Sequence, residues 1–418
     1  MLVKTILNHC YKFKSFVYKN VHLLSDDKGN PIIIVDIEAR TNGQKLCSKC
    51  LRPRPGYDRL KPRLYKFVPL WGIPVFFCYV RRRVNCPVHG VITEYIPWAD
   101  GKSHLTNVFK LFLSHWAGHL SWSTVAGIFK VQWYHVFDSV EWVVKYGLEH
   151  RCLEKIKAIG IDEIQYRMGH VYLTLVYQID SYSRRLLYVG KDRKAKSLLR
   201  FFYLFGKIRT SALEVICSDM WKPYLKVIAK KAPQALNILD RFHIMKKFNE
   251  AIDKTRRQEA KELEQAGLEP ILKHSRWCLL KNKNNQKESQ LAKLKELLKH
   301  NLKSVKCMLL REAFQQFWTY RSTYWAKRFF DQWLDRVNRS NLFEMKKVAK
   351  MLRCHEHLIF NWFKTKEHFS NGIVEGFNNK AKLTIKKAYG FKHFHTLEVA
   401  LYHQLGNLPV PKLTHTFY

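Results

Sequence analysis

Acidic residues are scarce in this chain of 418 residues, in which 34 Asp and Glu stand against 73 Lys and Arg. The resulting net charge of +39 is far more than solubility requires. A surplus of this size attracts polyanions, and the usual polyanion is nucleic acid. A ribosomal-type or heparin-like surface binder carries similar charge, but such proteins are typically shorter and lack acids on buried strands. The composition therefore favours a protein that binds nucleic acid.

Long hydrophobic runs are also missing: no uncharged apolar stretch could cross a membrane or act as a signal peptide. Most of the ten cysteines are scattered in apolar stretches, where reduced buried thiols are common, and do not form a disulfide framework. These absences predict a soluble, cytoplasmic protein with no membrane partner. The length and the hydrophobic content of 47% predict two or three well-packed domains.

One group of cysteines does have a regular spacing. Cys47 and Cys50 form a C-x2-C pair, and Cys86 and His89 form a C-x2-H pair. Four such ligands can hold one tetrahedral Zn²⁺ and leave no open position, so we expect a structural zinc ion. A disulfide is the alternative, which a reducing compartment disfavours. The surrounding residues 1–98 are rich in proline, which predicts short strands and turns in a small zinc-binding domain.

Residues 103–150 change to helical periodicity, with apolar and aromatic side chains three and four positions apart. Two helices are expected after the polar start at Ser121, with a short break near Lys130–Gln132. This pattern is typical of a helix-turn-helix, and the charge of the chain favours one that binds DNA. Any three-helix packing unit gives the same pattern, so that alternative stays open.

An alternation of strands and helices follows in residues 155–245. Three β-branched, apolar segments in succession predict a meander, after which the order is helix, strand, helix, strand. The predicted fold class is α/β, with a mixed five-stranded sheet in the order of the RNase H-like fold. Residues 246–365 are basic and helical in pattern, which predicts a large all-helical insertion. Residues 366–418 are expected to complete the core with a basic helix.

Two aspartates lie at the ends of apolar strands in this sheet. Asp162 follows AIGI on the first strand and Asp219 follows VIC on the fourth, and these strands are neighbours in the RNase H-like order. An unpaired carboxylate there is unfavourable, and a bound cation offsets the penalty. Mg²⁺ or Mn²⁺ prefers oxygen ligands, so the pair predicts a divalent metal site suited to phosphodiester chemistry.

Glu375 is expected to supply a third carboxylate from a helix near the C-terminus. Three polar residues share its helical face at spacings of four, three and four, namely Asn371, Asn378 and Lys382.

Two other acids compete for these roles. Asp180 also follows a strand, but SYSRR after it reads as a hairpin turn. Asp240 ends the fifth strand and stays open as an alternative ligand or a supporting group.

In order and content these motifs resemble the ISL3 family of bacterial insertion-sequence transposases. The matching pieces span nearly the whole chain: the cysteine and histidine finger, the helix-turn-helix, and the segments IGIDE, QIDSYSRRLLYV, SDMWKPY, LDRFH and NGIVEGFNNKAKLTIKKAYGF. The resemblance implies an RNase H-like domain in which a Mg²⁺-dependent Asp-Asp-Glu triad cuts and joins DNA. Matched by motif, the triad is Asp162, Asp219 and Glu375, and the helical insertion separates the last two.

The function expected from these features is transposition. The zinc-binding domain and the helix-turn-helix are expected to bind terminal inverted repeats of double-stranded DNA as a homo-oligomer, and the triad to catalyse strand cleavage and strand transfer. Trp221 is expected either to stack on an unpaired base or to pack in the core. Six side chains are expected to hold the DNA backbone: Lys380, Lys382, Lys386, Lys387, Arg241 and His243. A junction resolvase and a non-enzymatic DNA-binding regulator remain as alternatives.

Overall fold

The computed structural model describes residues 3–365 and 372–413. The chain forms two compact units, one of Met1–Cys152 with Leu383–Tyr418 and one of Leu153–Lys382. The described residues from Leu383 to Leu413 group with the first unit. No helix among the described residues is long and apolar enough to span a membrane.

The N-terminal part of the first unit is a five-stranded sheet, preceded in the chain by a short helix, α1 (Val3–Cys10). Its strand order is β1-β2-β4-β3, and β5 pairs with β4. Alternate side chains of β2 and β4 are buried, as the period of a strand with one core face requires. The strand bounds are β1 Phe16–Ser25, β2 Pro31–Ala39, β3 Gly56–Leu70, β4 Ile73–Cys86 and β5 Gly90–Thr93.

Two of these strands are longer than the proline content predicted. β3 has 15 residues and contains Pro62 and Pro69, yet it remains a strand because it lies at the edge of the sheet. An edge strand needs hydrogen bonds on one side only, so a missing N–H is tolerated there. The register between β3 and β4 shifts close to both prolines. The prediction of short strands was therefore wrong for β3 and for the 14-residue β4.

The rest of the first unit is helical. The expected pair of helices is present as α3 (Trp122–Ile128) and α4 (Trp133–His150), and the break between them includes Lys130. Ser121 caps α3, since its Oγ accepts a hydrogen bond from the N–H of Thr124 at 3.1 Å. α2 (Asn107–His119) and α16 (Phe394–Leu405) pack on α4, so the C-terminal helix completes this helical core.

The second unit contains the five-stranded sheet expected from residues 155–245. Its order is β10-β9-β6-β7-β8, with β6, β7 and β8 antiparallel and β6, β9 and β10 parallel. The predicted meander and the two later strands are thus confirmed as elements. Their bounds are β6 Ala158–Arg167, β7 Val171–Asp180, β8 Ser183–Gly190, β9 Val215–Ser218 and β10 Leu236–Leu239.

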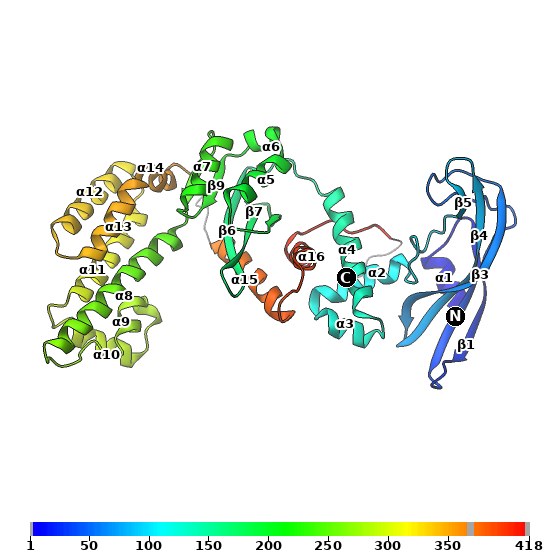
Figure 1. Ribbon diagram of the computed structural model, residues 1–418, viewed down its shortest axis with the longest axis horizontal. Helices are drawn as coiled ribbons and strands as arrows, with labels where there is room; N and C mark the ends of the chain where they lie inside the picture. The colour runs from blue at the N-terminus through cyan, green and yellow to red at the C-terminus, as the bar shows by residue number, and fades with distance from the viewer. Residues whose placement is uncertain (1–2, 366–371, 414–418) are drawn as a thin grey trace. The chain divides into compact units, whose positions relative to one another are not determined.

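Helices cover both faces of this sheet (Figure 1). Ile159 and Ile161 of β6 pack with α5 (Ala195–Phe205) and α7 (Lys222–Lys231), which α6 (Lys207–Ser211) separates along the chain. On the other face Gly160 meets Val374 of α15 (Gly372–Lys387). Odd and even positions of β6 therefore face different layers, as the strand period requires.

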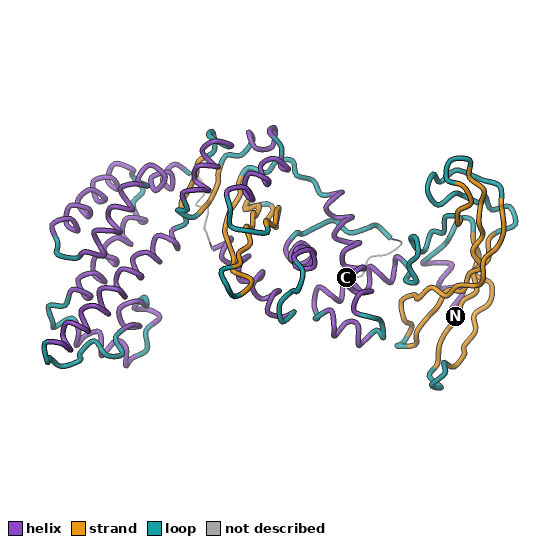
Figure 2. The backbone as a smooth tube through the Cα atoms, in the orientation of Figure 1, coloured by secondary structure: helices purple, strands orange, loops and turns teal. Residues whose placement is uncertain are grey.

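Between β10 and α15, the regular elements of the described residues are all helices, joined by loops and turns (Figure 2). This insertion begins with the 25-residue α8, directly after β10. Its interior is aromatic: the Phe314 ring lies 5.0 Å from Phe248 and 4.9 Å from Trp333 between centroids. The element bounds are α8 Arg241–Gln265, α9 Arg276–Leu280, η1 Lys283–Asn285, α10 Glu288–Leu297, α11 Lys303–Gln315, η2 Gln316–Thr319, α12 Thr323–Arg339, α13 Phe343–Cys354, α14 Glu356–Ile359 and η3 Phe360–Lys364.

Candidate active site and metal centre

The four expected zinc ligands lie together in the N-terminal unit. Their ligand atoms are all within 4.8 Å of one another, in the only such group of three or more Cys, His, Asp or Glu side chains among the described residues. The Sγ atoms of Cys50 and Cys86 are 3.8 Å apart, and His89 Nδ1 lies 3.6 Å from Cys47 Sγ and 3.5 Å from Cys86 Sγ. Around a tetrahedral zinc ion these separations are about 3.8 Å for two sulfurs and about 3.6 Å for sulfur and nitrogen. The cluster therefore fits one zinc ion.

The surroundings of this cluster favour thiolates. The pKa of Cys50 is lowered to about 7, first by the backbone N–H of Arg52 and then by neighbours that include the Arg54 guanidinium. Burial raises the pKa of Cys86, but hydrogen bonds from the Val88 backbone and from His89 outweigh it and lower the pKa. Thiolates are the form that binds zinc, so the donor chemistry agrees with the geometry.

Asp162 lies inside β6, opposite Leu175 of β7, and not at the strand end as the sequence indicated. The strand continues because the residues after Asp162 pair with β7 as far as Arg167. Burial raises the pKa of the Asp162 carboxyl. The charges of Asp240 and Asp219 add to the rise, while the N–H of Glu163 at 2.7 Å opposes it. Asp162 is thus a partly buried acid with two other acids near it.

Asp219 follows β9, and β9 pairs with β6, so the two strands that carry the aspartates are neighbours as predicted. Its Oδ1 accepts a hydrogen bond from the N–H of Trp221 at 2.9 Å. Its Oδ2 lies 4.0 Å from the guanidinium of Arg193, which also lies 2.6 Å from Glu163 Oε2. The guanidinium of Arg193 therefore places positive charge between Glu163 and Asp219.

Glu163 lies on the face of β6 opposite to Asp162, and its side chain is mostly covered. Burial raises the pKa of Glu163 to about 8, and the charge of Asp219 adds to this, while Arg193 lowers it. The acids at this end of the sheet thus form a strongly negative group that Arg193 balances only in part.

Asp240 and His243 complete this group of side chains. The N–H of Asp240 donates to the carbonyl of Ser218 at 2.9 Å, which holds the end of β10 beside Asp219. Asp240 Oδ1 accepts from the N–H of Phe242 at 2.7 Å and so caps α8. His243 Nε2 lies 3.8 Å from Asp162 Oδ1 and 3.8 Å from Asp240 Oδ2. His243 therefore lies between Asp162, an expected metal ligand, and Asp240, the alternative ligand.

Helix α15 contacts this site through Asn378. The buried Tyr177 hydroxyl donates to Asn378 Oδ1 at 3.0 Å, and Asn378 Nδ2 donates to Asp162 Oδ2. The rings of Tyr177 and Phe377 stack at 4.9 Å. Glu375 lies one helical turn before Asn378 and is exposed. The structure thus brings the helix of Glu375 to Asp162, while the three acids of the expected triad do not share one compact ligand cluster in the described chain.

The close fit of α15 on β6 depends on glycine at position 160. A Cβ there would lie 2.5 Å from Val374 Cγ2. We expect Gly160→Ala to lower the free energy of unfolding by about 1–3 kcal/mol, as overpacking does, and to slow the DNA cleavage that the sequence leads us to expect, by displacing α15. Urea unfolding and a cleavage assay measure the two effects.

Gly376→Ala is the matched control. Gly376 lies in α15 itself, and a Cβ there would meet no atom within 4 Å. In the double variant Gly160→Ala/Val374→Ala the loss is expected to be smaller than the sum of the single losses. Full stability and activity of Gly160→Ala alone would contradict the close fit.

Comparison with known proteins identifies the family. A sequence model of the ISL3 transposases, described as a transposase, matches residues 159–401, which is more than half of the chain. The chain belongs to the ISL3 transposase family. It is a DNA transposase, an enzyme that cuts and transfers DNA strands.

Two curated transposases are similar to this one along most of their length. The transposase for insertion sequence element IS1001 of Bordetella parapertussis is 26% identical over 351 residues, which cover 83% of this chain and 85% of the relative. The transposase for insertion sequence element IS1557 of Mycobacterium tuberculosis is 26% identical over 408 residues, which cover 91% of this chain and 90% of the relative.

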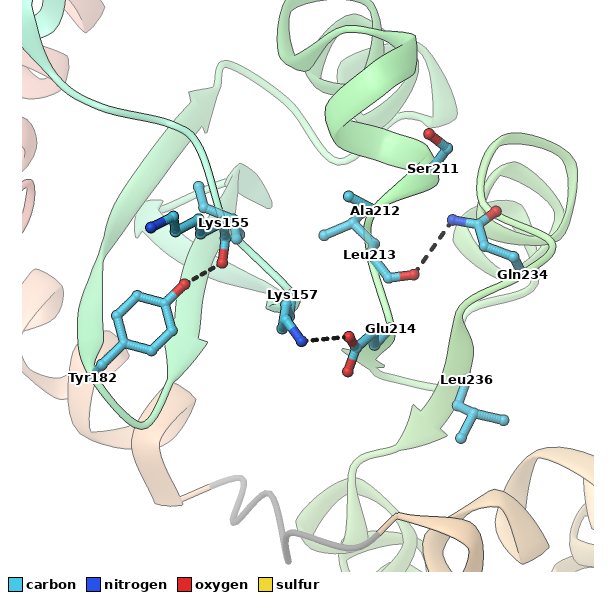
Figure 3. A pocket seen from close by; sticks show the side chains of 10 residues that line it. Lys155, Lys157, Tyr182, Ser211, Ala212, Leu213, Glu214, Gln234 and Leu236 are labelled. Atoms are coloured by element: carbon cyan, nitrogen blue, oxygen red, sulfur yellow. Dashed lines mark hydrogen bonds and ion pairs between the residues drawn. The ribbon is translucent and has the colours of Figure 1, made fainter.

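The rival acid Asp180 lies at the opposite end of the transposase's second sheet. It is buried, and its Oδ1 accepts hydrogen bonds from the N–H groups of Lys157 and Ala158 at 3.2 and 3.1 Å. An open hollow of about 900 Å³ lies at the same end, where Tyr182 donates to the carbonyl of Lys155 (Figure 3). Asp180 therefore joins strand ends together and is remote from the other three aspartates.

The side chains expected to hold DNA lie in different settings. Four lysines are exposed along α15: Lys380, Lys382, Lys386 and Lys387. Arg241 instead lies between two tryptophan rings, and His243 lies between two acids. Trp221 carries Arg193 over its ring at 4.8 Å and meets Tyr224 edge-on. Asn371, expected on the face of Glu375, lies outside the described residues.

Sequence reasoning missed three side chains of the transposase site. Arg193 is one of many basic residues in KDRKAK, and Tyr177 is one of several apolar residues of β7, so no local signal distinguishes either. Glu163 did carry a signal, since it follows Asp162 directly on a buried strand.

Proposed function

We propose that this transposase binds the terminal inverted repeats of an insertion sequence and cuts and joins DNA at a divalent metal site formed by Asp162, Asp219 and Glu375. The observation that carries the proposal is the pairing of β6, which contains Asp162, with β9, which Asp219 follows. The contact from Asn378 to Asp162 supports it, because it docks the helix of Glu375 at the same place.

We assign the catalytic sheet to the RNase H-like fold. If the five strands are numbered by their order in the chain, they lie in the sheet in the order 3-2-1-4-5. The first three are antiparallel, and the last two are parallel to the first. That is the order expected for this fold, and the helical insertion follows its fifth strand. The parts expected at 1–98, 103–150, 155–245 and 246–365 then serve as zinc-binding domain, helix-turn-helix, first part of the core and insertion.

The acids at this site suit Mg²⁺ or Mn²⁺. The pKa of Asp162 is raised chiefly by burial and further by the charges of Asp240 and Asp219, and a bound cation offsets both effects. When bound, such ions activate the attacking oxygen and stabilise the leaving oxygen of a phosphodiester. The chain itself orients Asp162 through Asn378 and Tyr177, and balances Asp219 with Arg193. Asp240 is the alternative third ligand.

The remaining parts of the chain bind DNA in this proposal. The zinc-binding domain and α3–α4 recognise the terminal repeats, and the exposed lysines of α15 hold phosphates beside the cut. Two element ends must be joined in one assembly, so a homo-oligomer forms on the DNA. The reaction takes place in the bacterial cytoplasm, on DNA of the nucleoid.

Purified protein tests the proposal on DNA that carries the terminal repeats of its own element. With Mg²⁺ we expect both strand cleavage at the repeat end and joining of the freed 3′ end to a second DNA. Cleavage without joining, and without dependence on the repeat, would instead support a junction resolvase. Specific binding with neither reaction would support a regulator.

A further inference from the structure

Arg241 is held between two indole rings. Its guanidinium carbon lies 4.8 Å from the ring centroid of Trp318 and 5.0 Å from that of Trp362. The two rings meet edge-on, with centroids 5.9 Å apart, and both tryptophans are buried. Arg241 itself is half-buried, and partial withdrawal of its charge from water strengthens the cation–π attraction to the two rings.

These three residues come from distant parts of the insertion. Arg241 is the first residue of α8, Trp318 lies in η2, and Trp362 lies in η3, close to the end of the insertion. Asn361, next to Trp362, donates through Nδ2 to the carbonyl of Asn237 in β10 at 2.9 Å. The beginning, middle and end of the insertion are therefore fastened to one another beside the last strand of the catalytic sheet.

The same turn of α8 carries two residues of the active site. Asp240 precedes Arg241 and caps the helix, and His243 follows two residues later, 3.8 Å from both Asp162 and Asp240. The first turn of a helix is rigid once its cap is formed. The place of Arg241 between the indoles therefore determines where Asp240 and His243 lie relative to Asp162.

We propose that Arg241, Trp318 and Trp362 form a clamp that positions Asp240 and His243 at the active site, so that the helical insertion controls the rate of DNA cleavage. The inference rests on the proposed function, because it assumes that Asp162 lies at the catalytic centre. The three are positioning residues: they act through Asp240 and His243. In this role the guanidinium of Arg241 faces the indoles and does not hold a DNA phosphate.

The test compares Arg241→Met and Trp362→Leu with the unaltered enzyme. Methionine keeps an unbranched apolar chain between the rings and removes the charge. We expect the single-turnover rate of cleavage to fall between about tenfold and about a hundredfold, as small misplacements of active-site groups do, with the affinity for terminal-repeat DNA unchanged. Trp362→Phe keeps an aromatic face and is expected to recover most of the rate.

Trp277→Leu is the matched control. Arg276 lies over the Trp277 ring at 5.1 Å, so this is another arginine–tryptophan pair of the same insertion, but Trp277 is exposed. We expect its loss to leave the cleavage rate unchanged. Normal rates in both Arg241→Met and Trp362→Leu would overturn the clamp, and so would a loss of DNA affinity with the rate retained.

A measurement without DNA separates failure of the clamp from failure of the proposed function. Amide hydrogen exchange at Phe242 and Ile244, whose N–H groups both donate to Asp240, is expected to rise about tenfold in Arg241→Met and to stay unchanged in Trp277→Leu. This result holds even if the protein does not cleave DNA through Asp162. Unchanged exchange in Arg241→Met would refute the clamp by itself.

Discussion

Asp162→Asn is expected to abolish strand cleavage while binding to terminal-repeat DNA persists. The asparagine can still accept the hydrogen bond from Asn378, so the sheet and α15 stay in place. What is lost is a charged ligand of the proposed metal site. Because metal ions contribute several kcal/mol and about 1.4 kcal/mol is a factor of ten, the cleavage rate should fall about a thousandfold. A gel assay of cleavage beside a binding titration measures both.

Glu214→Gln is the matched control for this variant. Glu214 precedes β9 at the opposite end of the same sheet and forms an exposed ion pair with Lys157 at 2.8 Å, visible in Figure 3. Its loss should leave cleavage intact. In the same assay Glu375→Gln is expected to be as inactive as Asp162→Asn, and Asp240→Asn to retain more activity. Cleavage by Asp162→Asn near the normal rate would remove Asp162 from the site.

Loss of zinc is expected to have the largest effect on stability. Structural zinc supplies about 10 kcal/mol or more in isolated fingers, but here the sheet has a hydrophobic core of its own, separate from the small cluster around Cys47 and Cys86. We therefore expect Cys86→Ser, or a strong chelator, to destabilise the N-terminal sheet by roughly 5 kcal/mol. Zinc content and thermal unfolding are the measurements, and specific binding of the repeats should be lost with them.

Cys78→Ser provides the comparison on the same strand, β4. Cys78 is a free cysteine outside the cluster, so zinc content should remain at one ion per chain and the unfolding temperature should change little. If Cys86→Ser retained both zinc and stability, the cluster would not be a structural zinc site.

Much of the fold was predictable because the local sequence pattern of these segments favours the same secondary structure that they adopt in the folded chain. The strands of the second sheet are apolar and β-branched, and the break between α3 and α4 interrupts a clear helical period. The length of β3 was not predictable, since proline is tolerated there only because that strand is at an edge, and edge position is a property of the whole sheet.

The candidate site was predictable in its acids and not in its supporting groups. Asp162 and Asp219 stood out because a carboxylate is costly beside buried apolar residues. Arg193 and Tyr177 reach the site only through tertiary packing, and many residues of their types occur in the chain. The setting of Arg241 was hidden for the same reason, because its two tryptophans are 77 or more positions away along the sequence.

The edge position of β3 also bears on how copies of this protein meet. Residues 104–106 bond to the outer side of β3 at Lys66, and Pro62 has no N–H to offer an added strand. Arg59 and Lys61 are exposed along the same strand. An incoming strand from another copy would meet an interrupted ladder and like charge, which protects this sheet from edge-to-edge aggregation. The same charge does not repel DNA, which is negatively charged and does not need to form backbone hydrogen bonds with the strand.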